Sequence, residues 1–277
     1  ISCGDLSSKS WIYQDDLQFF VKYLQNPQAQ YLLDTYFDRE LPTGTRIDFL
    51  LNLSPEVTPQ PTELAPFKIY NDRAHAFFRT GFESGSSLVA LTNPSFSENH
   101  AHKDRNSFIF EFNRDFLLID PEMINYSDPN GVNYKKTIFH NTLSVNGTDQ
   151  LFQARSFDVG FKTSGSTSGN TLPGNTGGID WVVSEAAEVY PQLSSFERHL
   201  IYFRPGLVVV WDRIQRKHEP VDLSWNFNFP APLNESEIAS QFVVRTDNNK
   251  LRVLINNLSD FDLSKIKMTT GMENIEA

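Results

Sequence analysis

Three histidines between residues 100 and 140 are the side chains best placed to do chemistry. His100 and His102 lie in the string His-Ala-His-Lys-Asp, and His140 follows in Phe-His-Asn. In an extended chain, residues two apart project to the same face, so His100 and His102 can address one site. Imidazole nitrogens bind metals and transfer protons near neutral pH. The segment therefore predicts a metal site, a proton-transfer site, or both.

A predicted hairpin adds a carboxylate to these histidines. Residues 107–119 form two apolar runs around a polar turn, and a turn centred near Arg114 returns Asp120 to the end where His102 enters. His102, Asp120 and His140 then supply two nitrogens and one oxygen. This set suits Zn²⁺ and leaves a fourth position for water or another ligand. The spacing predicts a metal site on these three residues.

The elements that must position these side chains are predicted to be strands. Short apolar runs alternate with Gly, Asn, Asp and Pro turns, and no helix of ordinary length interrupts them. A parallel sheet built from βαβ units is therefore not expected, and a large antiparallel β-sandwich is predicted. The predicted strands are Ala74–Arg79, Ser87–Leu91, Ser107–Phe112, Phe116–Ile119, Thr142–Val145, Trp181–Val183, His199–Phe203, Leu207–Trp211, Leu223–Phe229, Phe242–Arg245 and Leu251–Ile255.

The start of the chain has a different pattern. Apolar residues in the first 40 positions recur every three to four residues, as in helices, and Pro27 divides the stretch into two short helices. Four prolines within residues 54–66 mark a stiff connection. We therefore expect a helical segment at residues 1–53, a Pro-rich linker at 54–66 and the β-sandwich at 67–277. A Gly/Ser/Thr/Asn-rich stretch at residues 164–178 is predicted to be a loop.

Composition excludes several classes of protein. The 277 residues carry 24 Lys and Arg against 34 Asp and Glu, a net charge of −10. Such an acidic chain lacks the basic face of a broad nucleic-acid binder. No run approaches the roughly 18 apolar residues of a membrane span. The single cysteine, Cys3, can form neither an internal disulfide nor a cysteine-based zinc site.

Two motifs resemble those of a known family. Residues 100–108, HAHKDRNSF, are similar to the pattern H-x-H-x-D-x-x-S-F of the heparinase II/III-like polysaccharide lyases. Residues 140–147, HNTLSVNG, are close to the family's H-N-T-L-x-V-D-G. Residues 76–82 and 198–213 also resemble strands of its β domain, so the likeness spans roughly residues 70 to 230.

The resemblance implies a fold and a reaction. These lyases pack an N-terminal α/α toroid against a C-terminal antiparallel β-sandwich, and the cleft between the two holds an acidic polysaccharide such as alginate, heparan sulfate or another glycosaminoglycan. The polymer is cut by β-elimination: the uronate carboxylate is neutralised, a base removes the C5 proton, and an acid protonates the leaving O4. A 4,5-unsaturated sugar results.

Carried over to this sequence, the resemblance implies a role for each matching residue. Structural zinc would be held by His102, Asp120 and His140. Catalytic roles fall to His100 and Tyr126. The expected substrate contacts are Arg79, Lys103, Arg105 and Tyr134. His75, His199 and His218 have no motif around them and are interpreted as structural.

The helical segment is much shorter than a toroid. The family's principal tyrosine acid/base comes from that toroid, so the chain is expected to be either a portion of a longer enzyme or a separate β module without activity. Two other functions stay open: a non-catalytic carbohydrate-binding sandwich, and a metal-dependent hydrolase using the His/His/Asp set. The polysaccharide chemistry implies a bacterial protein in the periplasm or secreted.

Overall fold

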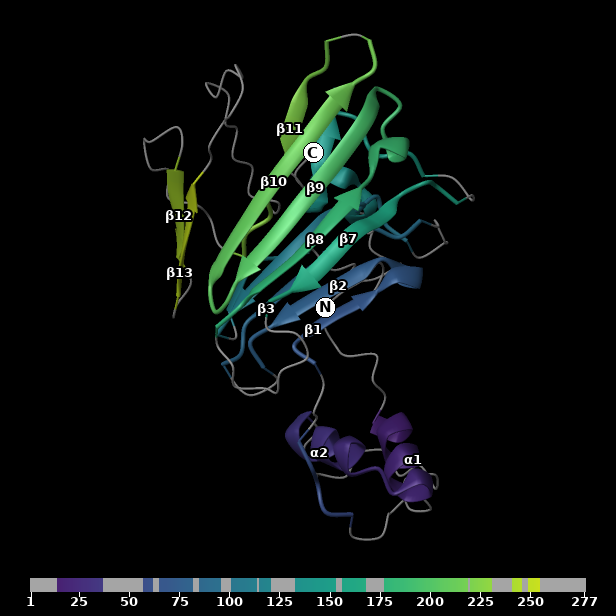
Figure 1. Ribbon diagram of the computed structural model, residues 1–277, viewed down its shortest axis with the longest axis vertical. Coiled ribbons are helices and arrows are strands. Elements are labelled where there is room, and N and C mark those ends of the chain that lie inside the picture. The colour runs from purple at the N-terminus through teal and green to yellow at the C-terminus, as the bar shows by residue number, and fades with distance from the viewer. Residues whose placement is uncertain are drawn as a thin grey trace. The chain divides into compact units, whose positions relative to one another are not determined.

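The computed structural model describes most of the β region and two helices (Figure 1). The described residues are 14–36, 57–61, 65–81, 85–95, 101–113, 115–120, 133–152, 156–167, 177–218, 220–230, 241–245 and 249–254. Among them, no helix is both long and apolar enough to cross a membrane. The chain divides into two compact units, one within residues 8–64 and the other from residue 65 onward.

The first unit contains the two predicted helices. Helix α1 spans Gln14–Leu24 and helix α2 spans Pro27–Tyr36. Pro27 occupies the first position of α2, where its missing N–H costs nothing. The side-chain oxygen of Asn26 accepts a hydrogen bond from the Ala29 N–H at 2.9 Å and caps the helix. The proline therefore ends one helix and begins the next, as the sequence predicted.

The core of this helical unit is small. Leu17 and Val21, one turn apart on α1, are buried together with Ala29. Leu32, Leu33 and Val57 pack against them. Three aromatic side chains of α1, Phe19, Phe20 and Tyr23, stay exposed to solvent.

The second unit contains two principal antiparallel sheets. The first has the order β1-β2-β3-β4-β5, and the second has the order β10-β9-β8-β7. The first consists of β1 (Phe67–Tyr70), β2 (His75–Arg79), β3 (Leu88–Thr92), β4 (Ser107–Phe112) and β5 (Asp115–Leu118). The second consists of β7 (Gly160–Ser166), β8 (Ile179–Glu185), β9 (Leu193–Phe203) and β10 (Leu207–Arg216).

Shorter elements complete the unit. Strand β6 (Leu143–Val145) pairs with β11 (Leu223–Trp225), and β12 (Gln241–Arg245) pairs with β13 (Lys250–Leu254). The 3₁₀ helices among the described residues are η1 (Asn71–Arg73), η2 (Asn133–Lys135), η3 (Thr137–Phe139) and η4 (Ala187–Val189).

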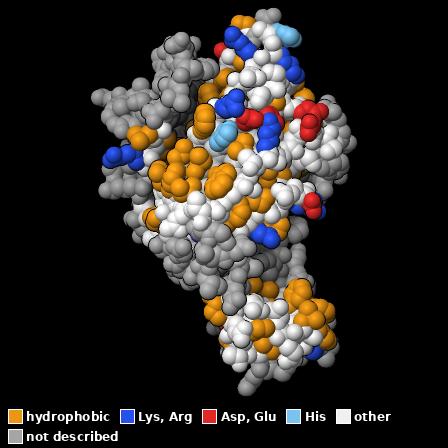
Figure 2. Space-filling view, in the orientation of Figure 1, with side chains coloured by type: hydrophobic (Ala, Val, Ile, Leu, Met, Phe, Trp, Pro, Cys, Tyr) orange, Lys and Arg blue, Asp and Glu red, His pale blue; other side chains and the backbone are white. Residues whose placement is uncertain are grey.

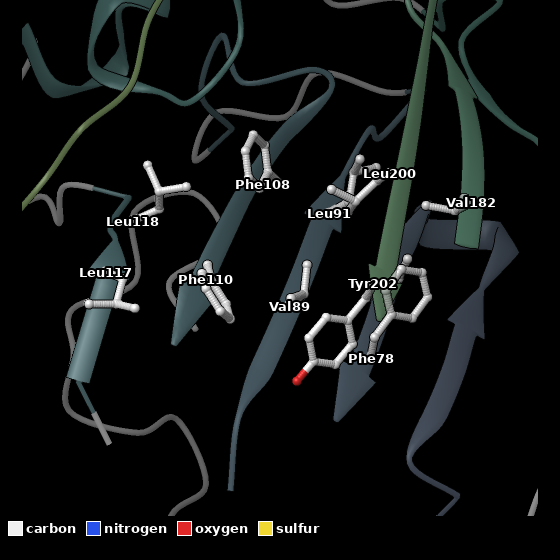
Figure 3. Close-up of a cluster of buried hydrophobic side chains, with 11 residues drawn as sticks. Phe78, Val89, Leu91, Phe108, Phe110, Leu117, Leu118, Val182, Leu200 and Tyr202 are labelled. Carbon is white, nitrogen blue, oxygen red and sulfur yellow. The ribbon is translucent and has the colours of Figure 1, made fainter. Parts of the chain in front are cut away.

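The main core lies between the two sheets, which confirms the predicted β-sandwich. Alternate residues of β2, β3 and β4 meet alternate residues of β8 and β9, as the two-residue period of a strand requires (Figure 3). The buried cluster is Ala76, Phe78, Val89, Leu91, Phe108, Phe110, Leu117, Leu118, Val182, Leu200 and Tyr202. A second buried cluster around Leu143, Val189 and Phe196 packs β6 against η4 and β9.

Some boundaries differ from the sequence-based prediction. Strand β7 includes Ser164–Ser166, which were predicted to begin a loop. These residues pair with β8 through backbone hydrogen bonds, and such pairing needs no apolar side chains. Strand β1 escaped prediction because its four residues follow directly on the proline-rich stretch. Strands β9 and β10 extend beyond their predicted bounds, because charged residues interrupt the apolar runs on which the prediction relied.

One charged side chain of β9 is completely buried where the sandwich meets its connecting loops. The Arg198 guanidinium forms a bidentate ion pair with Asp212 of β10, with N–O distances of 2.9 and 2.7 Å. Its Nη1 also donates to the carbonyl oxygens of Asn106 and Asn141, at 2.6 and 2.7 Å. Arg198 thus joins two loops to the second sheet.

Arg198→Met is expected to destabilise the chain by about 3–5 kcal/mol, because it leaves the buried Asp212 carboxylate without its counter-charge. The matched control is Arg213→Met, since Arg213 is 56% exposed in its ion pair with Glu197 and its loss should cost under about 1 kcal/mol. Urea unfolding of both variants measures the difference. Equal losses in the two variants would contradict the role given to Arg198.

Candidate metal centre

The three predicted ligands lie together. His102, Asp120 and His140 each offer one ligand atom, and these atoms are all within 4.8 Å of one another. The His140 Nδ1 atom lies 2.8 Å from the Asp120 carboxylate, and the imidazole centroids of His102 and His140 are 5.1 Å apart. Both histidines are buried, and Asp120 is partly exposed. Two nitrogens and a carboxylate at this spacing could hold a metal ion.

The hairpin of β4 and β5 positions two of these residues. His102 precedes β4, and Asp120 follows β5, so the antiparallel pairing returns them to the same end. A register irregularity between Phe110 and Glu111 shifts the pairing without separating the strands. The predicted turn residue Arg114 lies outside the described residues.

The third ligand is fixed by its neighbour Asn141. The Asn141 side-chain amide donates to the carbonyl oxygens of Phe108 in β4 and Ile119 after β5, both at 2.8 Å. Its backbone N–H donates to Ser107 Oγ at 3.0 Å. Because Ile119 precedes Asp120 and Asn141 follows His140, this clamp sets the distance between the two ligands.

Arg105 supports His102 from inside the protein. Its Nη1 donates to the His102 carbonyl oxygen at 2.7 Å, and its Nε donates to the Pro94 carbonyl at 3.2 Å. Gln150 grips the backbone of Arg105 twice, by accepting from its N–H and donating to its carbonyl, each at 2.9 Å. The side chain is completely buried. Its contacts hold the turn that presents His102.

The loop containing η2 and η3 is braced in the same manner. Asp149 accepts from the Lys103 ammonium at 2.6 Å and from the Thr137 N–H at 3.0 Å. The Lys103 backbone N–H donates to the Lys135 carbonyl at 3.0 Å. These bonds join the segment that carries His102 to the loop that leads to His140.

The carboxylates around His140 favour a positive charge at this place. Burial lowers its pKa, but the adjacent Asp120 carboxylate, with smaller contributions from Asp104 and Asp149, raises the pKa above its ordinary value overall. Its Nε2 atom is buried and makes no hydrogen bond to any described residue. Buried imidazole nitrogens are normally satisfied, and metal ligation satisfies one. The residues present therefore fit a bound cation.

The other predicted site residues are distributed more widely. Arg79 is half-buried on β2, with its guanidinium 5.2 Å from the centre of the Phe77 ring. Tyr134 in η2 packs against Phe139, with ring centroids 5.6 Å apart. The positions of His100 and Tyr126 lie outside the described residues.

Sequence reasoning missed the supporting role of several polar residues. Asn141, Gln150 and Arg198 have no metal-binding or catalytic spacing of their own. Asn141 and Arg198 each stand directly before a predicted strand, and Gln150 lies outside any predicted strand, so their sequence positions do not indicate that these polar side chains are buried. His75 was interpreted as structural. Burial lowers its pKa, and nearby Asp104 opposes that shift.

A family model described as heparinase II/III-like, C-terminal, matches residues 78–269, which are 192 of the 277 residues. The match contains all three residues of the candidate metal centre. The chain belongs to this family. No curated protein matches the chain.

Heparinase structures share the fold of this family member. A mutant of the heparan sulfate lyase HepC from Pedobacter heparinus aligns with a TM-score of 0.62 and 13% identity over 89% of this chain and 34% of its own. A heparinase III with methylated lysines aligns with a TM-score of 0.63 and 14% identity, over 89% of this chain and 33% of its own. A further heparinase III aligns with a TM-score of 0.61 and 15% identity, over 89% of this chain and 35% of its own. The chain therefore spans about a third of the length of these structures.

Removal of metal should lower the stability of the heparinase-like domain. Metal bound to the folded state at 100 to 1,000 times its dissociation constant adds about 3–4 kcal/mol, so a chelator should lower the unfolding temperature measurably. Asp120→Asn should abolish this response, whereas His218→Ala, at an exposed histidine outside the cluster, should retain it. Thermal unfolding with and without chelator tests this. If the chelator leaves the unfolding temperature of metal-loaded wild-type protein unchanged, that result would contradict the proposed metal site.

Arg105→Met should weaken metal binding about 10–100-fold, the usual effect of losing a group that orients a ligand. Competition with a chromogenic chelator, well below the unfolding temperature, measures the affinity. Arg213→Met on the second sheet is the matched control. Wild-type affinity in Arg105→Met would show that the His102 carbonyl needs no such support.

Proposed function

We propose that the chain is the β-domain portion of a polysaccharide lyase that cleaves an acidic, uronate-containing polysaccharide by β-elimination. The observation that carries this proposal is that the family match includes the cluster of His102, Asp120 and His140. Heparan sulfate is the first substrate to test, because the similar structures include a heparan sulfate lyase. Alginate and other glycosaminoglycans are the further candidates.

The reaction needs groups for three tasks. The uronate carboxylate must be neutralised so that the C5 proton becomes acidic, a base must remove that proton, and an acid must protonate O4. We assign proton transfer or carboxylate binding to His100 and Tyr126 on the strength of the family motifs. Arg79, Lys103 and Tyr134 are proposed as substrate contacts.

Arg105 receives a different role from the one its sequence position suggests. Its guanidinium is buried and already donates to the carbonyl oxygens of His102 and Pro94. A substrate carboxylate would have to displace these bonds inside the protein. We therefore propose that Arg105 positions His102 and does not touch the substrate.

We propose that the metal is Zn²⁺ and that its role is structural. His102, Asp120 and His140 would hold it, since two imidazoles and a carboxylate are ordinary zinc ligands. When bound, zinc would neutralise the Asp120 carboxylate and tie together the start of β4, the end of β5 and the η2–η3 loop. His100 is two residues before His102 in sequence, so its placement would depend on that tie.

We propose that a helical α/α domain completes the site. The chain spans about a third of its solved relatives, and α1 exposes the aromatic residues Phe19, Phe20 and Tyr23, which further helices would cover. The proposed organisation is the end of that domain at residues 1–53, the linker at 54–66 and the sandwich at 67–277. Polysaccharide substrates place such an enzyme in the bacterial periplasm or outside the cell.

The test is an assay of the full-length protein that contains this chain, on heparan sulfate and alginate. The expected result is a 4,5-unsaturated uronate, seen by its ultraviolet absorbance. His100→Ala should reduce turnover at least a hundredfold, the usual contribution of a proton-transfer group, while metal content stays at the wild-type level.

Two outcomes would overturn the proposal. New reducing ends without unsaturation, lost on chelation, would identify a metal-dependent hydrolase, since three protein ligands leave a metal position open. Binding of the polymers with no cleavage would identify a carbohydrate-binding module.

A further inference from the structure

The outer face of the second sheet carries an apolar surface that the proposed reaction does not use. The pairing of β8, β9 and β10 aligns Trp181, Ile201 and Val209 in one row across the strands. The next row contains His199 and Trp211. These residues alternate with the buried ones that face the core, so both rows point outward.

The β10 part of this surface is open to solvent, and Trp181 and Ile201 are partly buried. On β10, three successive outward residues are large and apolar, and Leu207, Val209 and Trp211 are 57%, 37% and 50% exposed. Figure 2 shows hydrophobic side chains gathered over this sheet. We name Trp181, Ile201, Leu207, Val209 and Trp211 the outer platform. An exposed apolar patch of this kind marks a binding surface.

Both tryptophans of the outer platform are held in fixed positions. The Trp211 ring stacks on His199, with centroids 4.9 Å apart and an interplanar angle of 28°. The Trp181 ring covers Gly165 of β7, where an added Cβ would lie 2.2 Å from the ring atom Cζ2. Only glycine permits this approach. Rings that are ordered before a ligand arrives lose little conformational entropy when they bind it.

Polar groups of both signs border the outer platform. The row beyond His199 contains Glu185, Glu197 and Arg213. Lys162 of β7 bridges the two carboxylates, at 3.2 Å from Glu185 and 2.7 Å from Glu197, and Arg213 lies 3.2 Å from Glu197. Two cations and two anions leave this border neutral. It offers donors and acceptors without a net field.

We infer that the outer platform binds a chain of pyranose sugars, at a site separate from the metal centre. The C–H faces of a pyranose ring stack on indole rings, and its hydroxyl groups match a border of mixed donors and acceptors. The two tryptophans lie two strands and one row apart, about 10 Å across the strands and 7 Å along them, so a ligand touching both must be an oligosaccharide.

Charge complementarity favours this occupant over a polyanion-specific site. A neutral border neither attracts nor repels sulfate and carboxylate groups, so binding depends on the sugar ring itself. The choice of a sugar as ligand rests on the proposed function. The outer platform would keep a polymer on the enzyme while the cleft acts on it, which raises the effective concentration of the substrate.

Calorimetry of the full-length protein that contains this chain with cellohexaose, a neutral pyranose oligomer, tests the inference. We expect binding that changes little between low and high salt. Trp211→Ala should weaken it about tenfold or more, the cost of removing an aromatic anchor, and Trp211→Tyr should keep most of it. Phe116→Ala, at a similarly exposed aromatic residue of the first sheet, is the control and should bind as wild type.

Cellohexaose contains no uronate and cannot undergo the elimination, so this result stands even if the lyase assay fails. Wild-type affinity in Trp211→Ala would overturn the inference. So would absence of cellohexaose binding together with heparan sulfate binding that disappears at high salt. A concentration-dependent dimer that Trp211→Ala dissociates would assign the outer platform to contact between two copies of the chain.

Discussion

The buried Arg198–Asp212 pair is the contact on which the rest of the β unit depends. Removing two charges from water costs several kcal/mol, and the cost is offset only when every donor and acceptor is satisfied. Arg198 meets that demand with two bonds to Asp212 and two backbone carbonyls, and Asp212 accepts a further bond from Trp225 at 2.8 Å. The carbonyls belong to Asn106 and Asn141, each within four residues of a proposed metal ligand. The same buried pair therefore stabilises the second sheet and holds the loops that carry the proposed metal ligands.

In the loops that carry the proposed ligands, side chains supply the hydrogen bonds that neighbouring strands supply in a sheet. The ligand-bearing segments are irregular, so their backbone groups lack ladder partners and need others. Asn141 joins β4 to the end of β5, Gln150 holds both backbone groups of Arg105, and Asn226 donates to the Thr137 carbonyl and to Ser144 Oγ. Since these bonds do not involve a metal, the three ligands are brought together by the fold. A cation would then bind a prepared site.

The sequence was sufficient to predict the elements with a periodic apolar pattern and the residues that belong to a motif. Alternating apolar residues revealed most strands, Pro27 located the break between the helices, and the return of a hairpin placed Asp120 beside His102. The sequence could not reveal which side chains contact each other when their contacts form only in the folded chain. Nothing in the sequence near Arg105 shows that its guanidinium points inward, and cross-strand register alone aligns Trp181 and Trp211 on one face. Strand β7 was not predicted, and its Ser164–Ser166 end was assigned to a loop, because its pairing lies in the backbone.

The charges around the metal centre bear on how much of an active site this chain can supply. The two cations nearest His102 in sequence are both committed, Lys103 to Asp149 and Arg105 to backbone carbonyls. An acidic polymer approaching a chain of net charge −10 needs local positive charge to neutralise a uronate carboxylate. The Lys103 charge is paired with Asp149, so a uronate carboxylate could bind Lys103 only by competing with that ion pair. If the proposed helical domain completes the site, it would be a further source of such charge.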